Sequence, residues 1–364
     1  MRTLTFTIAI PVRNGERFLA AAIESALAQS RPADEVMVVD DGSTDGTRAI
    51  ATDAKWRGRI RYVYNDKTTG CANAFNRAAR LAASELVVFL SSDDLLDPSF
   101  LQIVEGGLLT YPEAKFCYAA AKYIGAEGKP LHAVAQNSQS PPRLYDGKTY
   151  VHNYLAGCLN GEEIHRLAGV VVERRLFDEC QFRKEAGIMA DNDFFIRIAA
   201  RTNVVGIAEP LASVRVHADS ISSRLESLNL RVSEDYLYQV RFLIAHPEHI
   251  AAEDMLLVHT LAFRNLAKLL SEALLRGRPD LYAAAVRIMR ELVLAIGPEA
   301  SRKSIAKTGN LLCAIYRWSW ARYLYKAAVA AASVAKLLKR MRLRILLARR
   351  NRREEPKSAR LREV

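Results

Sequence analysis

The chain has 364 residues, half of them hydrophobic, which is enough for one substantial core and an accessory region. Its net charge of +12 comes from the C-terminal end: residues 301–364 carry 18 Lys and Arg against 3 Asp and Glu, which leaves residues 1–300 with a net charge of −3. A mildly acidic body argues against a nucleic-acid-binding core, and five widely spaced cysteines argue against a zinc ribbon or a disulfide framework.

Predicted strands and helices alternate at the start of the chain. β-rich apolar runs at residues 6–12, 35–39 and 86–90 are separated by helical patterns such as those at 18–29 and 72–83. This alternation predicts a parallel, doubly wound sheet. In such sheets, ligands bind beyond the carboxyl ends of the strands, where the connecting loops leave a crevice.

Polar clusters stand at the ends of these three predicted strands, at residues 13–16, 40–46 and 91–94. We therefore expect three separate stretches of the chain to converge on one region. Asp40 and Asp41 belong to the second cluster, and a carboxylate there can accept a hydrogen bond from a nucleobase N–H or a ribose hydroxyl. The alternative is a cap for the helix that starts near Thr47.

Asp93 and Asp94 follow the third predicted strand directly. Adjacent carboxylates at the end of a buried strand are costly unless water or a cation compensates them. Oxygen ligands favour Mg²⁺ or Mn²⁺, whose shells are usually completed by phosphate oxygens and water. A turn or helix cap before Pro98 is the structural alternative.

Further along the chain, a stretch rich in Pro, Gly and Gln at 125–147 precedes strand-like runs at 169–173 and 204–210, with a helical segment at 187–200 between them. Asp191 and Asp193 stand near the start of that segment. Either could act as a general base that takes the proton of an attacking hydroxyl, or could simply cap the helix. His217 follows the last strand as a structural residue or as a metal or phosphate contact.

From about residue 227 onward the pattern is helical, with apolar residues at helical spacing through 237–243, 255–275 and 281–296. We therefore predict three parts: a catalytic α/β domain at 1–226, a helical accessory region at 227–300, and a basic amphipathic helix and tail at 301–364. No stretch reaches the roughly 18 uninterrupted apolar residues that a membrane-spanning helix needs.

An apolar stripe runs from Trp320 to Ile345 at alternating steps of three and four residues, next to nearly unopposed Lys and Arg. This pattern is typical of a helix at an anionic membrane surface, but it also suits packing or dimerisation. Each basic residue near such a surface contributes about 1 kcal/mol. The expected location is the cytoplasm, with peripheral attachment to the inner face of the plasma membrane if the tail binds lipid.

Six motifs together resemble the family 2 glycosyltransferases of the GT-A fold. In order along the chain they are IAIPVRNG at 8–15, VVDDGSTD at 38–45, FLSSDD at 89–94, DNDFFIR at 191–197, EPL at 209–211 and RVH at 215–217. Each motif is weak alone, whereas their common order and spacing are specific. The resemblance covers roughly residues 5–225, and it implies a Rossmann-like, doubly wound mixed sheet with a helical C-terminal extension.

The resemblance assigns roles to the first three motifs. It implies that Asp41 faces the base of a donor nucleotide, and that Pro11 and Asn14 line the same pocket. It places Asp93 near the ribose, and it makes Asp94 the ligand of the Mn²⁺ or Mg²⁺ ion that bridges two phosphates.

The later motifs supply the remaining roles. The resemblance makes Asp191 the base, with Asp193 and Arg197 supporting it, and has His217 close over the diphosphate. Three positions depart from the family pattern: Ser91 stands where many members carry Asp, Ala190 where Glu is common, and Phe75 where an Arg often precedes Asn76.

The sequence therefore predicts an inverting glycosyltransferase. It would move a sugar from a nucleotide-diphosphate sugar, with UDP as the expected nucleotide, to a hydroxyl of a saccharide or lipid-linked acceptor in surface polysaccharide or glycolipid synthesis. One alternative is a nucleotidyltransferase, although the loop at 11–16 has one Gly where such enzymes usually carry a Gly-rich basic loop. The other is a non-catalytic nucleotide-binding or membrane scaffold of the same fold.

Overall fold

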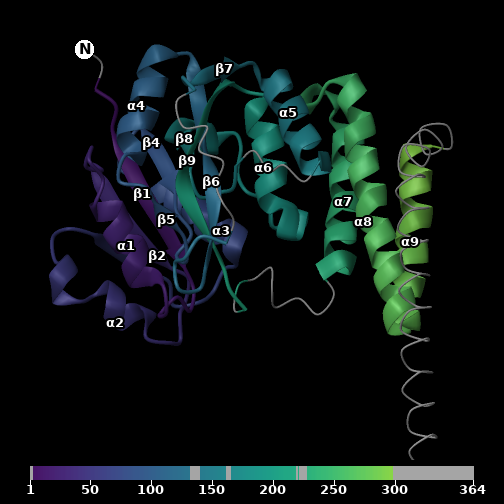
Figure 1. The fold of residues 1–364 in the computed structure, drawn as a ribbon, viewed down its shortest axis with the longest axis horizontal. Helices are drawn as coiled ribbons and strands as arrows, with labels where there is room; N and C mark the ends of the chain where they lie inside the picture. The colour runs from purple at the N-terminus through teal and green to yellow at the C-terminus, as the bar shows by residue number, and fades with distance from the viewer. Residues whose placement is uncertain (1–2, 132–139, 161–164, 219, 221–227, 298–364) are drawn as a thin grey trace, which may run out of the picture.

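The computed structural model describes residues 3–131, 140–160, 165–218, 220 and 228–297. A mixed sheet stands between two layers of helices, and the last helices form a bundle beside one layer (Figure 1). The strands are β1 (Phe6–Val12), β2 (Glu35–Asp40), β3 (Arg61–Tyr64), β4 (Leu86–Phe89), β5 (Leu95–Leu96), β6 (Ala114–Gly125), β7 (Arg143–Tyr145), β8 (Val170–Glu173) and β9 (Asn203–Val216). The α-helices are α1 (Leu19–Leu27), α2 (Thr47–Ala51), α3 (Cys71–Leu81), α4 (Phe100–Thr110), α5 (Gly147–Asn160), α6 (Ala190–Ala199), α7 (Leu228–Ala245), α8 (Met255–Arg276) and α9 (Pro279–Ile296).

The strand order is β3-β2-β1-β4-β8-β6-β9-β5, and β7 also pairs with β9. β1 to β4 are parallel in the way that the sequence predicts, while β8 runs antiparallel to both β4 and β6. β6 and β9 are again parallel. The sheet is therefore mixed, and the carboxyl ends of β1, β2, β4, β6 and β9 lie along one edge.

The side chains of β1 alternate between two hydrophobic cores, one on each face of the sheet. Ile8 and Ile10 face the core covered by α1 and α4, whereas Ala9 faces the core under α3, α5 and α6. Successive side chains of a strand point to opposite faces, so a strand buried on both sides is apolar throughout. All seven residues of β1 are buried, which accounts for its uninterrupted apolar run.

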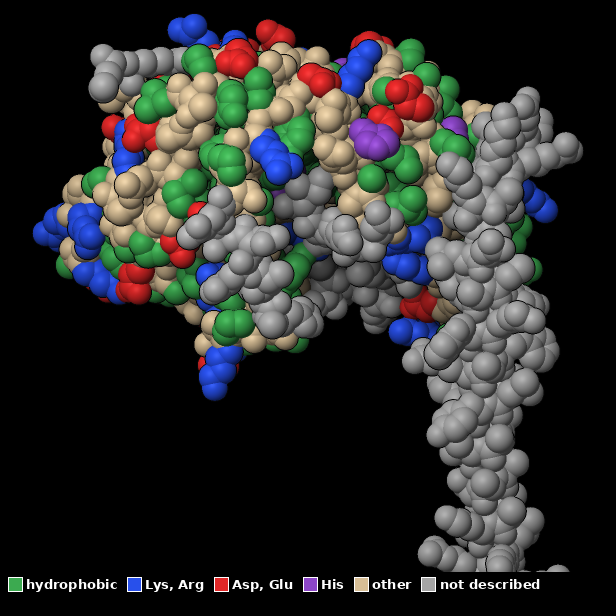
Figure 2. All heavy atoms as spheres, turned by 45° about the horizontal axis from the view of Figure 1, so that its top comes forward, with side chains coloured by type: hydrophobic (Ala, Val, Ile, Leu, Met, Phe, Trp, Pro, Cys, Tyr) green, Lys and Arg blue, Asp and Glu red, His purple; other side chains and the backbone are tan. Residues whose placement is uncertain are grey.

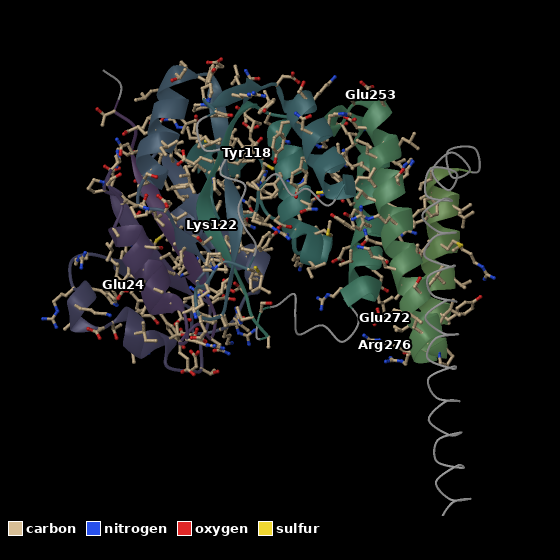
Figure 3. The ribbon with its side chains drawn as sticks, viewed as in Figure 1. Glu24, Tyr118, Lys122, Glu253, Glu272 and Arg276 are labelled. Atoms are coloured by element: carbon tan, nitrogen blue, oxygen red, sulfur yellow. The ribbon has the colours of Figure 1, made fainter. Side chains whose placement is uncertain are left out.

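The second of these cores continues beyond the sheet into the helical region. Phe194 and Phe195 of α6 belong to the same cluster of buried residues as Val240 of α7, Leu266 of α8 and Leu292 of α9. The predicted division between residues 1–226 and 227–300 stays a prediction, but the two parts share this core. Tyr118 and Lys122 mark the course of β6 through the sheet, and Glu253 and Arg276 lie near the two ends of α8 (Figure 3).

β6 and α5 are among the elements that were not expected from the sequence. β6 contains an alanine run with flanking lysines that favours a helix, yet it pairs with β8 and β9 along its length. α5 begins where the Pro-, Gly- and Gln-rich stretch at 125–147 ends, and the sequence pattern indicated no helix there. It follows Asp146, whose carboxylate accepts a hydrogen bond from the Thr149 N–H at 3.0 Å, which is a helix-capping contact. Strand pairing thus outweighed the weak local helix preference of β6, and the cap at Asp146 supports the start of α5.

The expected basic amphipathic helix at 301–364 lies outside the described residues. Within the described part, no helix combines the length and apolar character needed to cross a membrane. Acidic and basic side chains are interspersed over the described surface in the space-filling view (Figure 2). This mixture agrees with the small net charge of residues 1–300.

Candidate active site

The polar clusters after β1, β2 and β4 meet at one edge of the sheet, as expected. Asn14 has a φ of 53°, in the left-handed region that Asn tolerates better than most residues. Its N–H donates to the Ser43 hydroxyl at 2.9 Å, and its side-chain oxygen accepts from the Thr44 N–H at 2.8 Å. Asn14 therefore ties the loop after β1 to the loop after β2. Pro11 is buried in β1 opposite Val39.

Asp41 is almost fully buried and anchors the loop that leads into α3. Its carboxylate accepts hydrogen bonds from the side chain of Asn65, from the Thr69 N–H and hydroxyl, and from the Gly70 N–H, at 2.7 to 3.1 Å. Burial raises the pKa of Asp41, but these hydrogen bonds outweigh it and hold the pKa below its ordinary value. The carboxylate is therefore ionised, and Asp40 beside it accepts from the Tyr62 hydroxyl at 2.7 Å.

Asp93 and His217 form a contact across 124 residues of sequence. The Nε2 atom of His217 lies 3.0 Å from a carboxylate oxygen of Asp93, and the His217 ring packs against Phe18. His217 is nearly buried, while Asp93 is partly exposed. β9 thus delivers His217 to the turn after β4, which joins two residues that the sequence had singled out separately.

Asp94 lies behind Asp93 and is buried. Its carboxylate accepts a hydrogen bond from the Arg215 N–H at 2.8 Å, while the Arg215 guanidinium donates to the backbone oxygens of Asp93 and Ala126. Burial, and then the negative charge of Asp93, raise the pKa of Asp94 well above its ordinary value. Arg215 fixes the turn, but the negative charge at Asp94 remains poorly compensated.

The residues at this turn fit a divalent cation. Asp94 is a buried carboxylate short of positive charge, and the Nδ1 atom of His217 is buried with no hydrogen-bond partner among the described residues. Carboxylate oxygens with one imidazole nitrogen suit Mn²⁺, and carboxylates with water suit Mg²⁺. A cation would compensate Asp94 and Asp93 together.

Asp191 stands in the first turn of α6. The Asn192 N–H donates to its carboxylate at 2.8 Å, and the Tyr154 hydroxyl donates to the side chain of Asn192 at 2.6 Å. Asp191 is partly exposed, so its carboxylate can be reached from solvent. A carboxylate at the start of a helix is also favoured by the helix dipole.

Asp193 differs from Asp191 although only one residue separates them. It is 2% exposed, and its carboxylate lies between the guanidinium groups of Arg183 and Arg197. Arg197 donates two hydrogen bonds to it, at 2.7 and 2.9 Å, and Arg183 donates two more. Asp193 is thus a fully paired, buried anion that fastens α6 to the segment before it.

The thiol of Cys71, the first residue of α3, marks the place where the motifs meet. Cys71 is exposed, yet surrounding atoms partly desolvate the thiol, and the negative charges of Asp191, Asp41 and Asp93 act on it next, so that its pKa rises to about 11. Charges affect a pKa in this way only when they lie near the group. Carboxylates from three motifs therefore lie near one thiol.

Sequence reasoning did not identify Arg215, Cys71 or Thr69 as residues of this site. Arg215 stood beside His217 in a quoted motif, and its buried position next to two acids could have been inferred from that neighbour. Thr69 and Cys71 follow Gly70, whose φ of 91° allows the loop to turn back toward Asp41. No local pattern indicates a role for Thr69 or Cys71.

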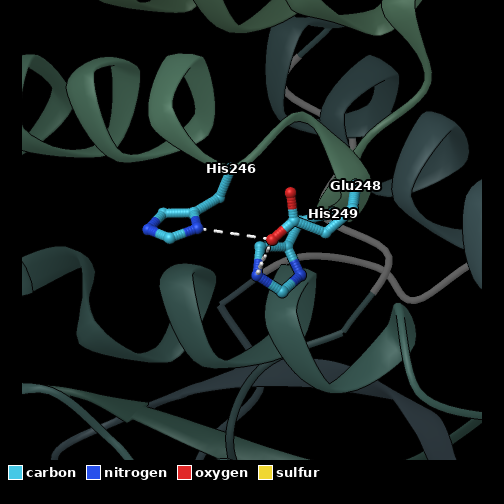
Figure 4. Close-up of side chains that lie close together, drawn as sticks. All are labelled: His246, Glu248 and His249. Atoms are coloured by element: carbon cyan, nitrogen blue, oxygen red, sulfur yellow. Dashed lines mark hydrogen bonds and ion pairs between the residues drawn. The ribbon is translucent and has the colours of Figure 1, made fainter.

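A second group of titratable side chains lies at the junction of α7 and α8. The ligand atoms of His246, Glu248 and His249 lie within 4.8 Å of one another (Figure 4). Glu248 is exposed and contacts both imidazoles, and Phe242 packs against both rings. Burial, together with the positive charge of Arg201, lowers the pKa of His249. Nearby cationic charge opposes metal binding, so we interpret this group as a surface hydrogen-bond network.

Residues 7–154 match the model of glycosyl transferase family 2. An uncharacterised glycosyltransferase of Rickettsia felis is 28% identical over 58% of this chain and 33% of its own length. The chain thus spans about a third of the length of the first curated relatives that it matches.

Two Bacillus subtilis proteins are also similar. The putative glycosyltransferase EpsH is 24% identical over 62% of this chain and 65% of its own length. The putative teichuronic acid biosynthesis glycosyltransferase TuaG is 30% identical over 42% of this chain and 59% of its own length.

Among solved structures, S. aureus TarS residues 1–349 in complex with UDP-GlcNAc superimposes with a TM-score of 0.63. The identity is 15%, and the match covers 86% of this chain and 88% of that one. This likeness confirms the predicted fold, including the mixed sheet and the helical C-terminal part. The resemblance indicated by the motifs is confirmed as well, and it favours a glycosyltransferase over a nucleotidyltransferase.

Proposed function

We propose that this chain transfers a sugar from a nucleotide-diphosphate sugar to an acceptor hydroxyl with inversion at the anomeric carbon, because residues 7–154 match the model of glycosyl transferase family 2. The observation that carries the proposal is that the carboxylates of Asp41, Asp93 and Asp191, which come from three separate motifs, lie near one side chain, the Cys71 thiol. A scaffold that only bound a nucleotide would have no need of the carboxylate at Asp191.

The loops after β1, β2 and β4 form the donor side in this proposal. Asp41, with Pro11 and Asn14 near it, faces the nucleobase, and Asp93 faces the ribose. In the absence of a ligand, Asp41 accepts hydrogen bonds from Thr69 and Gly70, so the loop before α3 bounds the base pocket. Nucleotide binding would therefore rearrange or extend this hydrogen-bond network.

Asp94 is the proposed metal ligand, and Asp93 and His217 lie beside it. When bound there, Mn²⁺ or Mg²⁺ would neutralise negative charge on the leaving diphosphate. Arg215 holds the turn through its N–H and guanidinium, so that the carboxylates stay in place when charge builds up. His217, which contacts Asp93 at 3.0 Å, closes over the diphosphate.

Asp191 is the proposed general base. The acceptor oxygen forms a bond to the anomeric carbon as the nucleoside diphosphate leaves from the opposite face, and Asp191 takes the acceptor's proton. Asp193 cannot share this role because its carboxylate is bound by two guanidinium groups. We assign it, with Arg197, to supporting the helix that carries the base.

The relatives support a proposal for the acceptor class. TuaG is described as a teichuronic acid biosynthesis enzyme, and TarS was solved with UDP-GlcNAc. We propose a UDP-sugar as donor and a cell-surface polysaccharide or its lipid-linked precursor as acceptor. Peripheral attachment of residues 301–364 to the cytoplasmic face of the membrane would bring the enzyme to such a precursor.

A thermal-shift panel of nucleotide sugars with and without Mn²⁺ tests the donor assignment. We expect one UDP-sugar to raise the unfolding temperature only when Mn²⁺ is present, and the same compound to be hydrolysed slowly. NMR of the transfer product should show the anomeric configuration opposite to that of the donor. A product that retains the donor configuration would rule out direct displacement.

Flotation of the full-length protein with liposomes tests the membrane assignment. The full chain should float with anionic vesicles and stay in solution with neutral ones, because the tail is cationic. A chain ending near Ser301 is the matched control and should not float. Equal behaviour of the two proteins would remove the membrane from the proposal.

A further inference from the structure

The segment before α6 contains a backbone turn that residues other than glycine rarely adopt. The short 3-10 helix η3 (Lys184–Met189) precedes α6, and Gly187 within it has φ 58° and ψ −126°. L-residues with a side chain rarely populate this region, whereas glycine does so at little cost. The direction in which α6 begins, and with it the position of Asp191, is therefore set at Gly187.

Asp235 of α7 holds this turn from outside the α/β domain. Its carboxylate accepts a hydrogen bond from the Ile188 N–H at 2.7 Å, across 47 residues of sequence. A side chain at position 187 would collide with both oxygens of that carboxylate. Asp235 and Gly187 thus fit together, and the helical region reaches the segment that carries the proposed base.

Two other contacts fix the same segment. The side chain of Asn76 on α3 both donates to and accepts from the backbone of Phe182, at 2.8 Å each. Arg183 then pairs with the buried carboxylate of Asp193. These contacts hold the start of the segment at Phe182 and Arg183. Asp235 holds it further along, at Ile188, three residues before Asp191.

We propose that Asp235 is a positioning residue, which sets the distance between the Asp191 carboxylate and the acceptor hydroxyl by fixing the Gly187–Ile188 peptide. This inference rests on the proposed role of Asp191 as base. It also gives the helical region a function in the reaction, since α7 completes the support of the active site. Small displacements of a reacting group are costly, because about 1 Å can lower a rate 100-fold.

Steady-state kinetics of Asp235→Ala and Asp235→Asn test the proposal, with donor binding measured by calorimetry. We expect Asp235→Ala to lower kcat by about 10- to 100-fold and to leave donor affinity within about twofold, since the donor loops are untouched. Asp235→Asn keeps an oxygen that can accept from Ile188, so it should recover much of kcat. Gly187→Ala should lower kcat in the same way as Asp235→Ala.

Glu234→Gln is the matched control, because Glu234 is the neighbouring acid on α7 and pairs with Arg287 at the surface. It should leave kcat unchanged. Asp191→Asn is measured alongside: if it stays active, the proposed base is wrong whatever Asp235 does. If Asp191→Asn is inactive while both folded Asp235 variants keep wild-type kcat, the positioning role is overturned. Equal losses in kcat and in donor affinity for Asp235→Asn would also overturn it.

Discussion

Two pairs of acids, Asp93 with Asp94 after β4 and Asp191 with Asp193 at the start of α6, look alike in sequence but differ in their surroundings. In each pair one carboxylate is buried and the other partly exposed. The buried Asp193 is paired with two guanidinium groups, whereas the buried Asp94 receives a backbone N–H and the repulsion of Asp93. Compensation of the buried charge therefore distinguishes a structural carboxylate from one that fits a cation.

Substitution of Asp191, the exposed member of the second pair, should have the largest effect, and this effect is on kcat. Asp191→Asn removes the proton acceptor but keeps the shape and the helix start, so kcat should fall by about 10²- to 10⁴-fold. Donor affinity and unfolding temperature should stay near wild-type values. Transfer assays and calorimetry with the same donor measure both quantities. Full activity in Asp191→Asn would assign the base elsewhere.

The buried member should show the opposite behaviour. Asp193→Asn leaves the buried guanidinium of Arg197 and the partly exposed guanidinium of Arg183 without their anion, which costs about 3–5 kcal/mol of folding free energy. Denaturant unfolding measures this loss. Asp191→Asn serves as the control, since it lies two positions away and should change the stability little. If Asp193→Asn were as stable as wild type, the two members of the pair would not differ as the structure implies.

Asp94→Asn tests the first pair. The amide oxygen can still accept from the Arg215 N–H, and the variant loses a poorly compensated buried charge, so stability without metal should change by less than about 1 kcal/mol. The gain in unfolding temperature on adding Mn²⁺ and donor should disappear, because a variant that no longer binds the metal is not stabilised by it. A preserved gain would place the metal ligands at other residues.

The sequence predicted the start of the fold well because the local pattern and the final pairing agree there. The run at 6–12 is apolar apart from Thr7, is followed by turn residues, and became β1 with the same limits. β6 was missed because its Ala119 to Lys122 stretch favours a helix, and only pairing with β8 and β9 makes it a strand. No local window contains that information.

The same reason explains what could be predicted of the site. Asp41, Asp93 and Asp191 could be proposed from the sequence because each follows a strand or starts a helix, which motifs can indicate. The difference between Asp191 and Asp193 depends on Arg183 in a separate loop, and the ionisation of Asp41 depends on Thr69. Partners that distant in sequence are brought together only by the fold.

The smallest expected effect comes from His165, a buried base that has no counter-charge. His165 is buried among aromatic rings and contacts the Tyr150 hydroxyl at 2.7 Å, and burial lowers its pKa to about 3. An unfolded His has a pKa of about 6.5, so between these values the unfolded state binds one more proton than the folded state. Stability should therefore fall as pH falls through this window, by about 1 kcal/mol for each pH unit from this residue.

Unfolding free energies measured from pH 7 to pH 4 check this sign. His165→Gln keeps an acceptor for Tyr150 but cannot be protonated, so its stability should depend less on pH by about 1 kcal/mol per unit, even if its stability at pH 7 is lower. Equal slopes in wild type and His165→Gln would mean that the folded protein accommodates the charged imidazole. The lack of a compensating charge would then not be enough to identify a buried group as an ion site. The assignment of Asp94 as the metal ligand would rest only on its neighbours His217 and Asp93.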